Sequence, residues 1–147
     1  MAREAVELPF RVLVAAVVVG ITVPTVFAGL SAYESQQLEV RAVQAVDAIV
    51  RVAQQFYVSG GGAEDVRVDL EAGFTARIEH VAIGDAAGGP MATTARYQIS
   101  GQREAFLIAD PPVPMAGEYG PLQLGPGRHV VRVSHDGEGP VRLAVVG

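Results

Sequence analysis

The stretch "VELPFRVLVAAVVVGITVPTVFAGL", residues 6–30, decides how the rest of the chain can fold. The nineteen residues from Val12 to Leu30 carry no charged side chain. A membrane-spanning helix needs about 20 mostly apolar residues, so this run is long enough to cross a bilayer. A helix of a soluble domain would show a polar face, and only Thr22 and Thr25 are polar here. The stretch therefore predicts a membrane span over about residues 10–30.

A cleaved secretory signal is the main alternative for this stretch. The sequences "VFA", ending at Ala28, and "LSA", ending at Ala32, both fit the small-residue sites at which signals are cut. The apolar run is longer than an ordinary signal core, and residues 1–11 carry two acidic and two basic side chains. Both features favour a permanent helix over a signal.

The basic residues around the span predict its orientation. Arg3, Arg11 and the amino terminus precede it, and the next basic residue after it is Arg41. Under the positive-inside rule, the N-terminus then lies in the cytoplasm and the bulk of the chain lies outside.

Residues 34–58 continue the helical pattern beyond the apolar run. One face is apolar at helical spacing, with Leu38, Ala42, Ala45, Ile49, Val52 and Phe56. The opposite face is polar, with Gln37, Arg41, Gln44, Asp47, Arg51 and Gln55. We predict one helix over 10–58, kinked at Pro24 and ended by "SGGGA" at residues 59–63. A capping box of Ser31 and Glu34 would instead start a second helix there.

The apolar face of this second half is wide. A helix that packs on one surface needs an apolar arc of about 100°. Val43, Val46, Val50 and Tyr57 lie beside the main stripe and extend the arc beyond that width. We therefore expect the stripe to pack on the chain's own β domain, and the flank of Val43, Val46 and Val50 to contact neighbouring copies.

The hydrophobic period changes from 3.6 to 2 after Gly62, which predicts an extracytoplasmic β domain over 63–147. The expected strands are 66–70, 74–78, 94–100, 103–110, 129–135 and 141–146, with a short one at 122–124 in a Pro/Gly-rich connection. The expected inward side chains are Val68, Ile78, Tyr97, Leu107, Val131, Val133, Leu143 and Val145; the arginines at 67, 77, 132 and 142 face outward. The fold class is α+β, a long helix followed by a small antiparallel β-sandwich.

Composition and motifs argue against several function classes. The net charge of −5 offers no electrostatic footprint for nucleic acid. The absence of cysteine excludes disulfides, thiolate metal sites and cysteine nucleophiles. His80, His129 and His135 have no ligand-like spacing and no accompanying carboxylate cluster. We therefore expect no catalytic set, no metal site and no cofactor.

An apolar helix that runs into an amphipathic helix and then into a small β domain resembles type IV pilin-like proteins, particularly archaeal pilins and archaellins. The resemblance implies a homopolymeric surface filament for adhesion or motility, whose subunits wait in the membrane before assembly. It also implies a prepilin peptidase and an assembly machinery as partners. The N-terminal helices would then pack together in the filament, with Val12, Val14, Val18 and Ile21 in the subunit interface.

A few positions carry this resemblance at the level of residues. A cut between Ala2 and Arg3 would put Glu7 at the fifth mature position, where the family commonly has glutamate. Pro24 resembles the helix-kinking prolines of pilins. Glu7 is costly in hydrocarbon unless it is paired, and Arg11 or a neighbouring subunit's amine would pair it.

The leader "MA" lacks the basic residue that usually precedes the archaeal cut. One alternative is therefore a single-span protein that keeps its leader and presents a β domain to an envelope or stator partner. An exported enzyme or ligand-binding β domain is a further alternative, although no motif in the sequence supports it.

Overall fold

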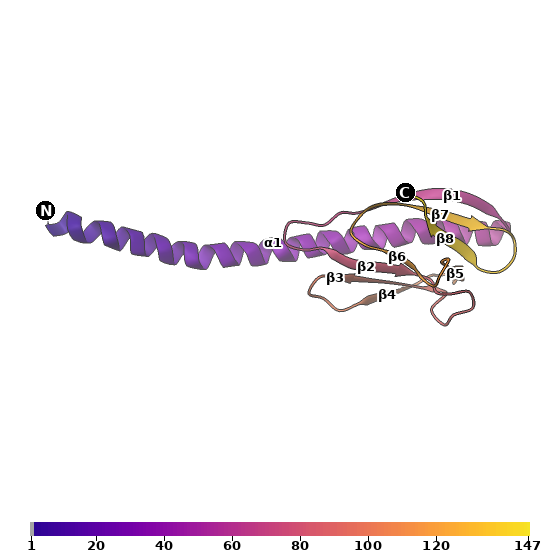
Figure 1. The fold of residues 1–147 in the computed structure, drawn as a ribbon. Coiled ribbons are helices and arrows are strands. Elements are labelled where there is room, and N and C mark those ends of the chain that lie inside the picture. Colours follow the sequence, from indigo (N-terminus) through magenta and orange to yellow (C-terminus); the bar gives the residue numbers. More distant parts are fainter. Residues whose placement is uncertain (1) are drawn as a thin grey trace.

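The computed structural model describes the backbone of residues 2–147 and the side chains of residues 7–147. In that part of the chain, a single helix, α1 (Ala2–Ser59), is followed by eight strands. Figure 1 shows that the N-terminal half of α1 projects alone from the β domain, whereas the C-terminal half lies along it. The architecture is the predicted one, a long helix followed by a small two-sheet β domain.

Helix α1 is continuous, as predicted. Ser31 and Glu34 both lie inside it, so they do not form the capping box that would have started a second helix. Its first residue is Ala2, so the helix begins before the expected start at Phe10. Its end at Ser59 agrees with the prediction that the glycines at 60–62 stop it.

Pro24 lies within α1 without breaking it. Proline has no N–H to donate to the carbonyl group four residues earlier, here that of Gly20. In the next position, the Thr25 hydroxyl donates to the carbonyl oxygen of Ile21 at 2.8 Å. Figure 1 shows a gentle curve in the N-terminal half of α1, so the expected kink is a shallow bend of a continuous helix.

The strands form two four-stranded sheets. The first has the order β1-β7-β8-β5, with β1 (Gly62–Leu70), β7 (Gly127–His135), β8 (Val141–Val145) and β5 (Met115–Ala116). The second has the order β4-β3-β2-β6, with β4 (Ala105–Ile108), β3 (Thr94–Ile99), β2 (Ile78–Ile83) and β6 (Leu122–Leu124). The named strand pairs are antiparallel, except for the short parallel pair of β5 and β8. The predicted sandwich is confirmed with this one parallel addition.

One predicted strand was wrong, and one strand was not predicted. Residues 74–77 form a loop, and the strand expected at 74–78 is instead β2, which starts at Ile78 and continues to Ile83. Its last three residues are all buried, so the alternation that signals a strand is absent there. The two-residue strand β5 was also missed inside the Pro/Gly-rich connection.

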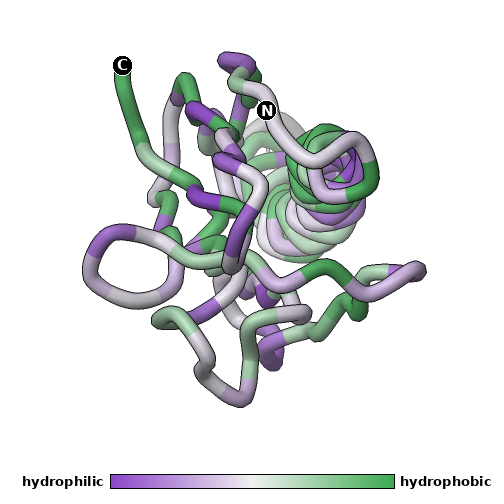
Figure 2. Tube along the Cα trace, turned by 90° about the vertical axis from the view of Figure 1, so that its right-hand side faces the viewer, coloured by the Kyte–Doolittle hydropathy of each residue, from purple (hydrophilic) through white to green (hydrophobic). Residues whose placement is uncertain are grey.

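The C-terminal half of α1 is part of the β domain's core. It contacts β1 and β7 of one sheet and β3 and β2 of the other, and Figure 2 shows it along one side of the domain. Leu38, Ala42, Ala45 and Ile49 are buried, and Val52 and Phe56 pack at the margin of the core. The stripe therefore packs on the chain's own β domain, as predicted.

Most of the inward positions predicted for the β half are buried: Val68, Ile78, Tyr97, Val131, Val133 and Leu143. Leu107 is only partly buried. Val145 is 46 % exposed, so that prediction was wrong. It shares a face of β8 with the buried Val141 and Leu143, but it is the last residue of the strand, where the burial of that face ends. The arginines at 67, 77, 132 and 142 are exposed, as expected.

Candidate functional site

A long exposed apolar surface runs along the N-terminal half of α1. Every residue over 7–30 is exposed, including the four that the resemblance to pilins places in a subunit interface. Val12 is 63 % exposed, Val14 45 %, Val18 54 % and Ile21 67 %. Within the described residues, α1 is the one helix that is long and apolar enough to cross a membrane. Exposed apolar surface on this scale marks a membrane or protein interaction site.

Charged groups lie at the start of this surface. Glu7 and Arg11 are one helical turn apart, yet the ion pairs among residues 7–147 do not include one between them. The predicted processing residues Ala2 and Arg3 lie outside the residues whose side chains the structure describes.

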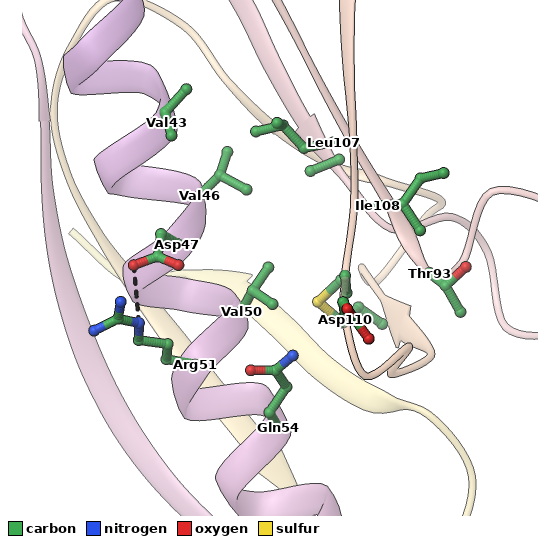
Figure 3. Close-up of a pocket in the computed structure, with 13 residues that line it drawn as sticks. Val43, Val46, Asp47, Val50, Arg51, Gln54, Thr93, Leu107, Ile108 and Asp110 are labelled. Atoms are coloured by element: carbon green, nitrogen blue, oxygen red, sulfur yellow. Dashed lines mark ion pairs between the residues drawn. The ribbon is translucent and has the colours of Figure 1, made fainter.

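A second apolar feature is a groove of about 420 Å³ between α1 and strand β4, shown in Figure 3. Val43 and Val50 line it from the helix, and Leu107 and Ile108 line it from the strand. Ile108 is 77 % exposed. β4 is also the edge strand of its sheet, so one side of its backbone has no neighbouring strand.

Three polar side chains that line the groove, Asp47, Arg51 and Gln54, have partners within the chain. Arg51 Nε lies 2.9 Å from an Asp47 carboxylate oxygen, an exposed pair one helical turn apart. Gln54 Nε2 donates to the carbonyl oxygen of Pro111 at 3.1 Å and ties the helix to the segment after β4. Thr93 and Asp110 also line the groove, so its apolar walls have polar groups beside them.

Val46 corrects the predicted interface flank. It is 3 % exposed and belongs to the core of its own chain, so the prediction that it contacts neighbouring copies was wrong. The apolar arc of α1 is wide because the helix packs against both sheets. Val50 is partly buried for the same reason, and Val43, at 36 % exposed, is the exposed member of the flank.

Glu34 lies just beyond the apolar half of α1 and holds the loop between β1 and β2. Its carboxylate accepts hydrogen bonds from the backbone N–H groups of Phe74 (2.9 Å), Thr75 and Ala76 (3.1 Å), and from the Thr75 hydroxyl. The hydrogen bond from the Thr75 hydroxyl, followed by that from its backbone N–H, lowers the pKa of Glu34, while partial burial opposes the shift.

These contacts explain why residues 74–77 are not a strand. The N–H groups that would have joined a ladder are donated to Glu34 instead. Gly73 leaves room for the carboxylate, because a Cβ there would lie 2.9 Å from the Glu34 carboxyl carbon. No pattern in the sequence signals this contact, which joins residues 40 or more positions apart.

The same loop carries an exposed aromatic side chain toward the apolar half of α1. Figure 1 shows the loop between β1 and β2 reaching along the helix toward the N-terminus. Phe74 is 81 % exposed, and its ring centroid lies 6.4 Å from that of Phe27. Phe27 belongs to the uncharged run, so the β domain and the apolar half of α1 meet at this point.

The three histidines lie apart and serve separate structural contacts. His80 pairs with Glu104 at 2.9 Å. His129 contacts a backbone carbonyl oxygen of the adjacent turn, and His135 contacts that of Phe56 at the end of α1. In the part of the chain with described side chains, no His, Asp and Glu residues cluster as a metal site would require.

Comparison of the chain with protein-family models, with curated proteins and with solved structures gives no match. The surfaces described above offer exposed apolar side chains and a loop backbone that Glu34 holds in place. Surfaces of this kind serve binding and assembly.

Proposed function

We propose that this protein is the structural subunit of an extracellular type IV pilus-like filament, held in the cell membrane by the N-terminal half of α1 before assembly. One observation carries the proposal. A single continuous helix joins an exposed half, which is uncharged from Val12 to Leu30, to a half that lies in the core of the β domain. The helix can therefore present the β domain at one fixed position on a bundle of apolar helices.

The physical properties of such a helix suit both of its environments. Except where a proline lacks an N–H, its backbone groups are hydrogen-bonded within the helix, which suits both lipid and protein neighbours. Val12, Val14, Val18 and Ile21 keep apolar contacts when identical helices replace the lipid. Copies that stack by the same rotation and rise make a contact that does not close on itself, which produces a filament.

The topology of the proposal follows from the charges. Arg11 precedes the span, so the N-terminus lies in the cytoplasm and the β domain lies outside. Glu7 would be paired by the amine or the arginine of a neighbouring subunit, since its own chain does not pair it with Arg11. A prepilin peptidase and an assembly machinery would process and polymerise the chain.

The groove beside β4 favours a second candidate, a membrane-anchored protein whose outer domain binds an envelope partner. Val43 and Ile108 are exposed at that groove, and the edge of β4 is free to pair with a strand. In this candidate the apolar half of α1 stays in lipid permanently.

Photo-crosslinking separates the two candidates. Benzoylphenylalanine would replace Val18 in one variant and Ile108 in another, each made as the full chain in its producing cells. A filament predicts that the Val18 variant forms a ladder of multimers of the chain on irradiation, together with filaments in electron micrographs. A Val18 variant that links only to lipid, without filaments, would overturn the proposal. An Ile108 variant linked to one different protein would then support the second candidate.

A further inference from the structure

We propose that the loop between β1 and β2, residues 71–77, is a membrane-contact element of the anchored chain. Phe74 enters the outer boundary of the bilayer's hydrocarbon beside Phe27, and Glu34 holds it there. This inference rests on the membrane-anchoring part of the proposed function.

The depth of Phe74 follows from the helix. The uncharged run from Val12 to Leu30 rises about 28 Å at about 1.5 Å per residue, close to the thickness of a bilayer's hydrocarbon core. Phe27 then lies about 4.5 Å inside the outer end of the run. Since the rings of Phe27 and Phe74 are 6.4 Å apart, Phe74 lies at the level of the outermost acyl groups and not in bulk water.

The chemistry of the loop suits this position. Its central residues 72–76, "AGFTA", carry no charge. The charges that flank them are neutralised by partners: Glu71 pairs with Arg128 at 2.9 Å, and Arg77 with Glu79 at 3.4 Å. Tyr33, which is 60 % exposed, lies about 9 Å beyond Phe27 along the helix axis. Aromatic side chains concentrate at this level of a membrane.

Glu34 removes the main obstacle to placing a loop near hydrocarbon. Backbone N–H groups without partners are costly in an apolar environment. Here the N–H groups of residues 74–76 all donate to the Glu34 carboxylate, and Gly73 N–H donates to the carbonyl oxygen of Ala76 at 2.8 Å. The loop thus presents an apolar ring while its N–H groups over residues 73–76 have hydrogen-bond acceptors.

Lipid is the occupant that this geometry favours. The contact is made next to the chain's own apolar helix, at a height where an anchored single chain is surrounded by lipid. Phe27, at 49 % exposed, and Phe74 form one continuous aromatic surface with the lipid-facing helix. A neighbouring copy could cover the same surface only after assembly, and the test separates these cases.

The chain contains no tryptophan, so a single introduced tryptophan reports on one position. Three full-length variants, Phe74→Trp, Val19→Trp and Tyr119→Trp, would be reconstituted in phosphatidylcholine vesicles that contain lipids brominated near the headgroup or near the chain end. We expect Phe74→Trp to lose most of its fluorescence to the shallow quencher, and Val19→Trp to lose most to the deep one. Tyr119, which is 95 % exposed in the connection between β5 and β6, should be unaffected.

A Glu34→Gln change in the Phe74→Trp background tests whether the hydrogen bonds of Glu34 hold the loop, because the amide cannot accept all four of them. Quenching of the tryptophan fluorescence by the shallow bromines should then fall. If Val19→Trp is not quenched, the membrane anchoring fails and this inference fails with it. If Val19→Trp is quenched and Phe74→Trp is not, this inference alone is overturned. An unquenched Phe74→Trp whose emission shifts to the blue only in filaments would assign the surface to a neighbouring copy.

Discussion

Replacing Ile49 by alanine tests whether the C-terminal half of α1 is part of the β domain's core. Ile49 is 0 % exposed. At about 0.8 kcal/mol per buried carbon group, the substitution loses about 2.4 kcal/mol of transfer free energy. The cavity left behind raises the total to about 3.5 kcal/mol. At about 4 °C per kcal/mol for a folded unit of this size, the melting temperature should fall by about 14 °C.

The assay is thermal unfolding of the full chain in detergent micelles. The near-ultraviolet circular dichroism of tyrosine is the best signal, because Tyr97 is buried in β3 and donates to Glu39 on α1 at 3.1 Å. Val43→Ala is the matched control on the same helix. Its side chain is 36 % exposed, so the loss should stay below about 1 kcal/mol. Equal melting temperatures for the wild type and Ile49→Ala, or equal shifts for the two variants, would refute the packing described here.

Three further predictions concern positions that the fold brings into contact. Val46→Glu should lower the same melting temperature by at least about 8 °C, because about 2 kcal/mol of apolar burial is lost before any charge is considered. An unchanged melting temperature would show that Val46 is not buried in the core. The lowered pKa of Glu34 means that the unfolded chain takes up a proton more readily than the folded one. Glu34 therefore contributes stability above its ordinary pKa of 4.5 that is lost as the pH falls through the lowered folded value. The free energy of unfolding should therefore depend less on pH in the acid range for Glu34→Gln than for the wild type. Identical pH dependence would contradict the contact of Glu34 with the loop. Gly62→Ala should lower the free energy of unfolding, measured by denaturant titration, by more than about 1 kcal/mol, since φ is +144° and the new Cβ would lie 2.5 Å from the Phe56 ring. An unchanged free energy of unfolding would show that the helix end can relax.

The structure also limits where subunits of a filament can meet. Burial of α1 begins at Ser35, about one turn after the uncharged run ends at Leu30. The apolar half is therefore exposed over residues 7–30, with Phe74 of the β1–β2 loop beside Phe27, and the core of the β domain starts directly above it. Contacts between neighbouring copies can use the N-terminal half and the rim at Val43, but not the stripe that the β domain already covers.

The sequence by itself determined the outline of this protein, because local periodicity carries it. A charge-free run followed by 3.6-residue spacing, with no glycine or proline over 30–58, was enough to predict one helix. The change to a period of 2 after Gly62 was enough to predict a β domain, including the burial of Val131 and Val133. These features depend on neighbours in the chain, so they can be seen without the fold.

Only the tertiary structure decided how the elements meet. Val46 was assigned to another subunit because the width of an apolar arc does not show whether one sheet or two will cover it. Glu34 was considered as a helix cap, because no neighbouring residue in the chain indicates its hydrogen bonds to a loop 40 or more residues away. The sequence of β2 does not alternate between apolar and polar residues over Val81, Ala82 and Ile83, because both faces of the strand are buried there. In each case the deciding contact joins segments that are distant in sequence, and its free energy exists only once both are in place.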